Sequence, residues 1–188
     1  MLIENARLSF PSLFVATSYA ADQGRKYSAT FILPKSDSRQ LGAIKAAMQR
    51  AADQKWGRDK PLGIQSCLRD GDADKTHLDG FQGCLFFNAS NDKRPGVYDR
   101  DRSPLTQDDG RPYAGCRVNA EVEFWAQDNH YGRRINASLR GVQFVADDDA
   151  FGGTGTPATA DEFPQIDTAA NHGAGSEQIV GGDADFLS

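Results

Sequence analysis

The sequence predicts a mainly β protein with one helix, folded into a barrel and followed by an acidic carboxyl-terminal segment. Three observations lead to this fold class. Apolar and polar residues alternate with a period of two in several segments, as expected for half-buried strands. One segment repeats its apolar residues at helical spacing, and the chain of 188 residues has room for one core ahead of the acidic segment.

Two strands are predicted near the amino terminus. Residues 6–10 alternate, and so does the segment KYSATFILP at 26–34, which ends at Pro34. The side chains predicted to face inward are Ala6, Leu8, Phe10, Tyr27, Ala29, Phe31 and Leu33, and those predicted to face outward are Arg7, Ser9, Lys26, Ser28 and Thr30. Residues 14–19 are expected to form a further strand between these two.

The helix is predicted directly after the second strand. Asp37 or Ser38 can cap its start, and Gly57 follows its end. Its apolar stripe consists of Leu41, Ile44, Met48 and Ala51. Beyond it we expect turns in residues 60–80, a buried strand in CLFFNAS at 84–90, and a long irregular loop from 91 to 111.

Two longer strands are predicted to close the body. Their inward side chains are Val118, Ala120, Val122 and Phe124 in residues 117–125, and Ile135, Ala137, Leu139, Val142 and Phe144 in residues 134–144. The change of phase at Gly141 predicts a bulge, and residues 128–132 predict a hairpin connection. A short bent sheet with one helix and long loops suits the OB-fold, a five-stranded Greek-key barrel.

Charge divides the chain into a predicted domain, residues 1–145, and a predicted tail, residues 146–188. The first part holds 21 basic and 17 acidic residues, whereas the second holds nine acidic residues and no basic one. The tail is rich in Gly, Thr, Ala, Asp and Pro, a composition that predicts disorder. Such asymmetry favours a body that meets a polyanion and a tail that competes with it, and it is also compatible with a solubilising tail on an ordinary domain.

Composition restricts the setting of the protein. The sequence has no apolar run of membrane-spanning length and no signal peptide at its start, so a soluble intracellular protein without membrane contact is expected. The cysteines Cys67, Cys84 and Cys116 are too widely spaced for a metal pair and are predicted to be buried free thiols. No metal or cofactor is expected.

Catalysis finds weak support in the sequence. The three histidines have no spacing suited to a metal or a triad, and no nucleophile motif or phosphate-binding glycine loop is present. The alternative is a metal-dependent nuclease or other DNA-processing enzyme that uses the cluster Asp70, Asp72 and Asp74. The main prediction is a protein that is not an enzyme.

Nucleic-acid binding is better supported, because cations and small polar residues share the outward faces of several predicted strands. Aromatic residues interleave with these cations and could stack on unpaired bases. The predicted nucleic-acid-binding residues are Arg7, Lys26, Lys93, Arg94, Tyr98, Arg100, Trp125, Tyr131, Arg133, Arg134 and Arg140. The end of the tail is predicted to dock into a partner through Asp183, Asp185, Phe186 and Leu187.

The ordered segments NARLSFPSLF, KYSATFILPK, GFQGCLFFNAS, AGCRVNAEVEFWAQDN and GRRINASLRGVQFV carry a family resemblance. Over residues 2–145 the sequence resembles the phage single-stranded DNA-binding protein family typified by the protein of Enterobacter phage Enc34. The resemblance implies an OB-fold protein that coats single strands in the host cytoplasm during phage DNA replication or recombination. Separately, the acidic end with its terminal aromatic residue resembles the tails of bacterial and phage single-strand binders, and this implies a tail that recruits replication proteins and competes with DNA. A protein-interaction module, with a basic face for an acidic protein, is a further alternative.

Overall fold

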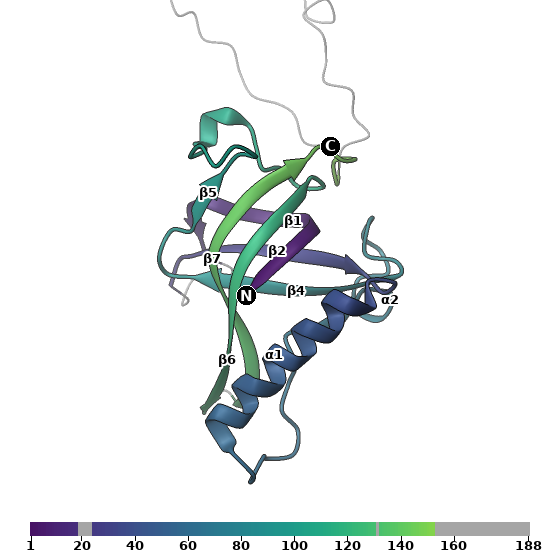
Figure 1. The fold of residues 1–188 in the computed structure, drawn as a ribbon, viewed down its shortest axis with the longest axis vertical. Coiled ribbons are helices and arrows are strands. Elements are labelled where there is room, and N and C mark those ends of the chain that lie inside the picture. The colour runs from purple at the N-terminus through teal and green to yellow at the C-terminus, as the bar shows by residue number, and fades with distance from the viewer. Residues whose placement is uncertain (19–23, 131, 153–188) are drawn as a thin grey trace, which may run out of the picture. The chain divides into compact units, whose positions relative to one another are not determined.

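The computed structural model describes residues 1–18, 24–130 and 132–152 (Figure 1). Strands dominate this part of the chain, and α1 is its one long helix. In chain order the elements are β1 (Leu2–Thr17), β2 (Lys26–Pro34), α1 (Ser38–Trp56), β3 (Arg69–Asp70), α2 (Gly71–Asp74), β4 (Cys84–Asn91), β5 (Gly96–Tyr98), a 3₁₀ turn (Gln107–Asp109), β6 (Arg117–Asn129) and β7 (Gly132–Ala146).

Five of the strands close a barrel. β4, β2, β1, β6 and β7 are neighbours in that order, each pair antiparallel. A parallel pairing of β4 with β7, through Ala89 with Ala137 and Ser90 with Ser138, completes the ring. The short strands β3 and β5 extend the sheet beside β4 and β7. The predicted mainly β barrel of five strands with one principal helix is confirmed.

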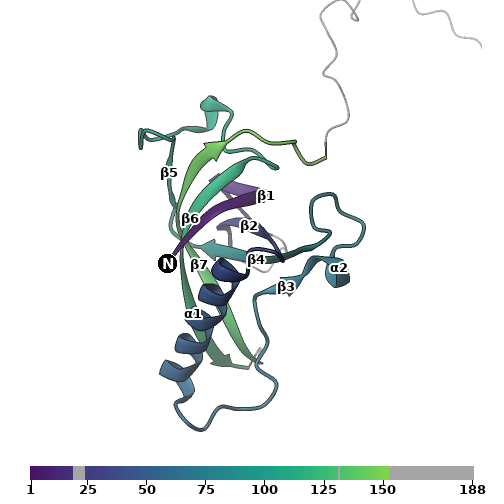
Figure 2. The same cartoon turned by 45° about the vertical axis from the view of Figure 1, so that its right-hand side comes forward.

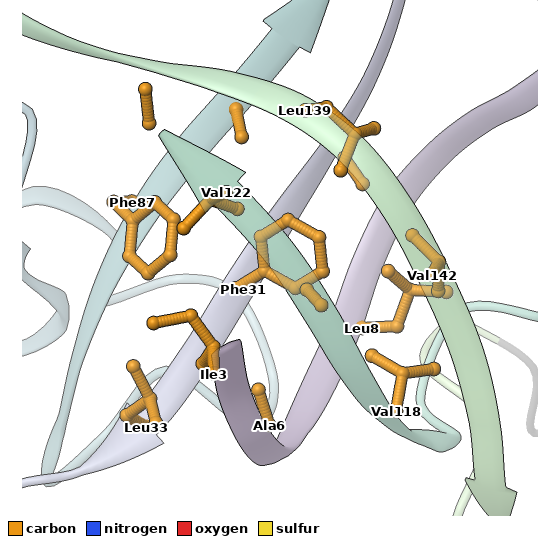
Figure 3. Packing of buried hydrophobic residues seen from close by; sticks show 14 of the residues in the cluster. Ile3, Ala6, Leu8, Phe31, Leu33, Phe87, Val118, Val122, Leu139 and Val142 are labelled. Carbon is orange, nitrogen blue, oxygen red and sulfur yellow. The ribbon is translucent and has the colours of Figure 1, made fainter. Parts of the chain in front are cut away.

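The core lies inside this barrel and follows from the alternation of the strands. Figure 3 shows side chains from all five strands converging there, and they are Ile3, Ala6, Leu8, Phe31, Leu33, Phe87, Val118, Val122, Leu139 and Val142. Each of these is at most 2% exposed. Fully burying a large apolar side chain contributes about 1.5–3 kcal/mol, so this cluster holds the sheet closed.

The helix is formed as the sequence predicts. Asp37 accepts a hydrogen bond from the Gln40 backbone N–H at 3.0 Å, and the Gly57 N–H donates to the Asp53 carbonyl at 2.8 Å. In Figures 1 and 2 the helix lies beside the hairpin end of β6 and β7. There Trp56 Nε1 donates to Asp128 Oδ2 at 3.0 Å, which ties the helix to the hairpin.

The amino-terminal strand departs from the prediction. β1 runs without a break, so residues 14–17 belong to it rather than to a separate strand. Its register with β2 shifts between Ser9 and Ser12, and Phe10 has a φ of 46°. This irregularity reverses the expected phase, because Phe10 is 52% exposed whereas Ser9 is buried.

Other elements were partly predicted. The bulge at Gly141 is confirmed, because Glu121 pairs with Gly141 and Val122 with Leu139, which leaves one extra residue in β7. The expected loop at 91–111 contains β5 and the 3₁₀ turn, and residues 60–80 contain β3 and α2. Among the described residues, no helix combines the length and apolar character needed to span a membrane.

Candidate nucleic-acid interface

A polar groove of about 470 Å³ lies on the barrel where β4 and β7 meet. Its walls come from β2, β3, β4, β6 and β7 and from the segment before β3. We call it the polar groove, because uncharged amide and hydroxyl side chains dominate its lining. Its lining residues are Lys26, Cys67, Arg69, Phe86, Asn88, Ser90, Asn91, Asp92, Trp125, Gln127, Asn136, Ala137 and Ser138.

Strand register explains why these side chains meet. Side chains two residues apart on a strand share a face, which places Asn88 beside Ser90 and Asn136 beside Ser138. The pairing of Ser90 with Ser138 brings the two polar rows together. On the other side of β7, Trp125 of β6 pairs with Asn136 and therefore shares the same face.

Hydrogen bonds organise the amides of the groove. Asn136 Nδ2 donates to Gln127 Oε1 at 2.9 Å, and Gln127 Nε2 donates to Asn129 Oδ1 at 2.9 Å. Asn91 Nδ2 donates to the Leu139 carbonyl at 2.9 Å, which fastens the end of β4 to β7. The Asn136 and Asn91 side chains are thus held in place, whereas Asn88 is exposed at the groove.

The rim of the groove carries an aromatic ring and two cations. Trp125 is 42% exposed. Lys26 Nζ lies 3.6 Å from Asp92 Oδ1, and Arg69 Nε lies 2.9 Å from Asp74 Oδ2. Exposed ion pairs of this kind contribute about 0–1 kcal/mol, so an incoming phosphate can replace either carboxylate.

The thiol of Cys67 lines part of the polar groove and is neutral. Burial raises the pKa of the Cys67 thiol to about 11, so this group stays protonated near neutral pH and adds no negative charge. All three cysteines are free thiols as predicted, but only Cys116 is fully buried, whereas Cys67 and Cys84 are partly exposed.

Comparison with known proteins places the barrel in a family. The family model described as "Enterobacter phage Enc34, ssDNA-binding protein" matches residues 1–173. The chain belongs to this family. "Putative protein p50" of Acyrthosiphon pisum secondary endosymbiont phage 1 is 44% identical over 176 residues, which cover 89% of this chain and 94% of that protein.

Solved structures of two phage proteins illustrate the similarity of this barrel to known folds. The single-stranded DNA-binding protein of bacteriophage Enc34 in complex with ssDNA has a TM-score of 0.70 and 30% identity, covering 80% of this chain and 88% of that one. The single-stranded DNA-binding protein gp2.5 of bacteriophage T7 has a TM-score of 0.56 over 94% and 96% of the two chains. At 14% identity it supports the fold alone, and the predicted OB-fold is confirmed.

Among the predicted binding residues, the structure brings Lys26 and Trp125 together at the polar groove. Two predicted cations, Arg133 and Arg134, lie on β7 next to the hairpin turn and close to the polar groove. Arg133 Nε is 3.5 Å from Asp128 Oδ1, and Arg134 is half-buried opposite Gln127. Tyr131 lies outside the described residues, as do Asp183, Asp185, Phe186 and Leu187 of the predicted docking peptide.

Other predicted residues lie away from the groove. Tyr98 pairs with Gln143, well beyond the stretch of β7 that lines the groove, and Arg100 lies 5.5 Å from the Phe144 ring. Arg140 is bound to Glu123 at 2.8 Å. Lys93 and Arg94 are exposed in the segment after β4. The Lys93 backbone N–H donates to Asn91 Oδ1, and the Arg94 guanidinium lies over the Phe14 ring.

Three placements correct the sequence interpretation. Ser28 and Thr30 have the outward phase on β2 but are 1% and 7% exposed, so they offer no phosphate contact. Arg7 is held within the fold, with its Nε donating to the Gly115 carbonyl at 3.1 Å. Arg69 was missed, because its place at the groove depends on the two-residue pairing of β3 with β4, which leaves no periodic signal.

The acidic cluster considered for a nuclease has a structural role. Lys35 Nζ lies 2.7 Å from both Asp70 Oδ1 and Asp72 Oδ2, and Arg69 binds Asp74. The hydrogen bond from Lys35 is the main cause that lowers the pKa of both Asp70 and Asp72. Each carboxylate thus faces a cation of the chain itself, and no group of three or more metal-ligating side chains occurs in the described part of the chain.

Proposed function

We propose that this chain binds single-stranded DNA through the polar groove, with little dependence on base sequence. Membership of the Enc34 family supports the proposal, since the relatives with solved structures are named as single-stranded DNA-binding proteins. The observation that carries it is the presence of an exposed indole, an exposed ammonium and a row of amides on one face of this barrel, represented by Trp125, Lys26 and Asn136.

Each kind of side chain has a separate task in this proposal. A base stacks on Trp125, an interaction that contributes about 1–3 kcal/mol and is open to every base. Lys26 and Arg69 exchange their carboxylates for backbone phosphates. The amide of Asn88 both donates and accepts, so it can meet different base edges without selecting one.

This binding suits a protein that coats single strands. We place it in phage DNA replication or recombination, in the cytoplasm of the infected host cell. The groove holds and covers the strand without changing it, so no reaction or turnover is part of the function.

The test is a titration with fluorescent oligo-dT, repeated with duplex DNA and with RNA of matched length. Affinity for oligo-dT should exceed affinity for the duplex and should fall linearly with the logarithm of salt concentration, because bound phosphates release counterions. Affinity that does not change with salt, or a preference for the duplex, would contradict the proposal. The RNA arm decides whether the groove discriminates between the two single strands.

The tail has a second role in the proposed function. We propose that residues 146–188 compete with DNA and recruit replication proteins through the peptide that contains Phe186 and Leu187. A chain that ends at Gly152 retains every described contact and should bind oligo-dT more tightly, because 36 residues that carry six acids are lost. Equal affinity of the two chains would disprove competition by residues 153–188.

A further inference from the structure

Two arginines meet on the barrel away from the polar groove. Arg7 of β1 and Arg117 of β6 are directly paired across the two antiparallel strands. Like charges in such a position destabilise a sheet unless an anion lies between them. Here the anion is Asp148, whose Oδ2 is 2.6 Å from Arg117 Nε and 3.5 Å from Arg7 Nε.

The segment that carries Asp148 is fastened to the barrel at several points. We call residues 147–152 the clasp. Tyr113 donates its hydroxyl hydrogen toward Asp147 Oδ1 at 3.0 Å, and the Phe151 N–H donates to the Ala114 carbonyl at 3.0 Å. The Phe151 ring lies 4.3 Å from the Arg7 guanidinium carbon.

Two glycines make room for the clasp. A Cβ on Gly115 would lie 2.2 Å from the Asp149 carbonyl oxygen, and a Cβ on Gly80 would lie 2.2 Å from the Phe151 ring. A side chain at Gly115 would force the clasp backbone to shift, and one at Gly80 would force the Phe151 ring to move. The clasp is therefore an integrated part of the fold rather than a chance contact of the tail.

The site has the chemistry of a phosphate site. Guanidinium groups bind carboxylate and phosphate in the same way, through charge-assisted N–H donors. The Asp149 backbone N–H, followed by Arg117, holds the pKa of the Asp148 carboxyl below its usual range, so the group is ionised at neutral pH. The side chains of Arg7, Arg117 and Asp148 are 19%, 31% and 26% exposed, so the site lies at the surface and solvent reaches part of it.

We propose that Arg7 and Arg117 form a phosphate-binding site that the clasp keeps closed, with the Asp148 carboxylate in the place of a phosphate. The ligand is a phosphodiester of single-stranded DNA. While the clasp is in place, two strong cations are withheld from nucleic acid and the strand is confined to the polar groove. Opening the clasp adds a second contact region to the barrel.

The test uses the full chain with Asp148→Asn and, as the matched control, Asp149→Asn. Both variants lose one negative charge, but the Asp149 carboxylate makes no ion pair among the described residues. D148N should steepen the salt dependence of oligo-dT binding by about 1.4 in logarithmic slope, since each added phosphate contributes about 0.7 on a single strand. D149N should leave the slope unchanged.

Adding Arg7→Gln and Arg117→Gln to D148N should restore the original slope. The same two substitutions in the otherwise unchanged chain should leave the slope as it is, because the arginines are closed there. Equal slopes for D148N and D149N would overturn the proposal. So would a loss of slope when the arginines are replaced in the unchanged chain.

A second variant guards against misfolding of D148N. Tyr113→Phe removes a hydroxyl that holds the clasp and changes no charge, so it should steepen the slope in the same direction by a smaller amount. Tripolyphosphate is a probe that does not depend on the polar groove. Calorimetry should detect binding of tripolyphosphate to D148N and not to D149N. This measurement tests the arginine site alone, so its result is independent of whether the polar groove binds DNA.

Discussion

Two of the cation-bearing surfaces of this barrel, the polar groove and the clasp site, hold their cations in opposite ways. At the polar groove, Lys26 and its partner Asp92 are 53% and 79% exposed and lie 3.6 Å apart. At the clasp, Arg117 lies 2.6 Å from Asp148 and both are about one-quarter to one-third exposed. Under the two proposals above, a cation is available to DNA when it can leave its internal partner easily, so the number of cations on the barrel is a poor guide to where DNA binds.

The largest expected effect tests the groove side of this comparison. Trp125→Ala should weaken oligo-dT binding by about 5- to 150-fold, which corresponds to about 1–3 kcal/mol for one lost stacking platform. Tyr98→Ala is the matched control, since Tyr98 is 43% exposed and does not line the groove. Fluorescence anisotropy measures both. Equal losses of oligo-dT affinity for the two variants would contradict base stacking on Trp125.

The clasp side is tested through stability. Phe151→Ala should lower the free energy of unfolding by about 1–2 kcal/mol, because a half-buried ring that packs near Phe81 is lost. Urea denaturation followed by circular dichroism measures the change. Leu62→Ala serves as the control, because Leu62 is 96% exposed and its truncation should change stability by less than about 0.5 kcal/mol. An unchanged midpoint for F151A would mean that the clasp does not contribute to the fold.

A smaller effect sharpens the account of the groove cation. Lys26→Gln should reduce the salt slope of oligo-dT binding by about 0.7, the contribution of one phosphate contact on a single strand. Lys45→Gln removes an equal charge on α1, outside the polar groove, and should leave the slope unchanged. If both variants reduce the slope equally, the binding surface extends over the helix.

The smallest expected effect is the acid response of the clasp. The folded-state pKa of Asp148 is lowered, so its contribution to stability is fully present above the unfolded-state pKa and is lost as pH falls through the folded-state value. The stability advantage of the unchanged chain over D148N should therefore persist at pH 6 and shrink below about pH 4. Urea midpoints of both proteins between pH 6 and pH 3 measure it, and a constant difference would contradict the role of the ionised carboxylate.

The sequence predicted most of the strands because their core residues alternate strictly. The series Val118, Ala120 and Val122 has the burial that alternation implies, and α1 begins and ends at its predicted caps. The prediction was wrong at Phe10, where a single residue with positive φ reverses the phase that alternation assumes. A local backbone irregularity of this kind leaves no trace in hydrophobic periodicity.

The candidate site was less predictable than the fold. Lys26 and Trp125 carry a sequence signal, because each has the outward phase on a regular strand. Arg69 reaches the groove through tertiary pairing of two residues, and Arg7 is withdrawn by a clasp more than 140 positions away in the chain. Alternation along a strand predicts which side chains point away from the core. It does not predict which distant segments of the chain pack over those side chains.

Within the part of the chain that the structure describes, two parallel residue pairs between β4 and β7 close the barrel, and the polar groove lies over them. This junction is a seam between segments almost fifty residues apart. A strand of DNA that contacts both Asn88 of β4 and Asn136 of β7 would bridge this junction. Binding and closure of the seam would then favour each other, because a ligand that prefers the closed barrel stabilises it by mass action. The folded barrel would therefore be most stable against unfolding when single-stranded DNA is bound.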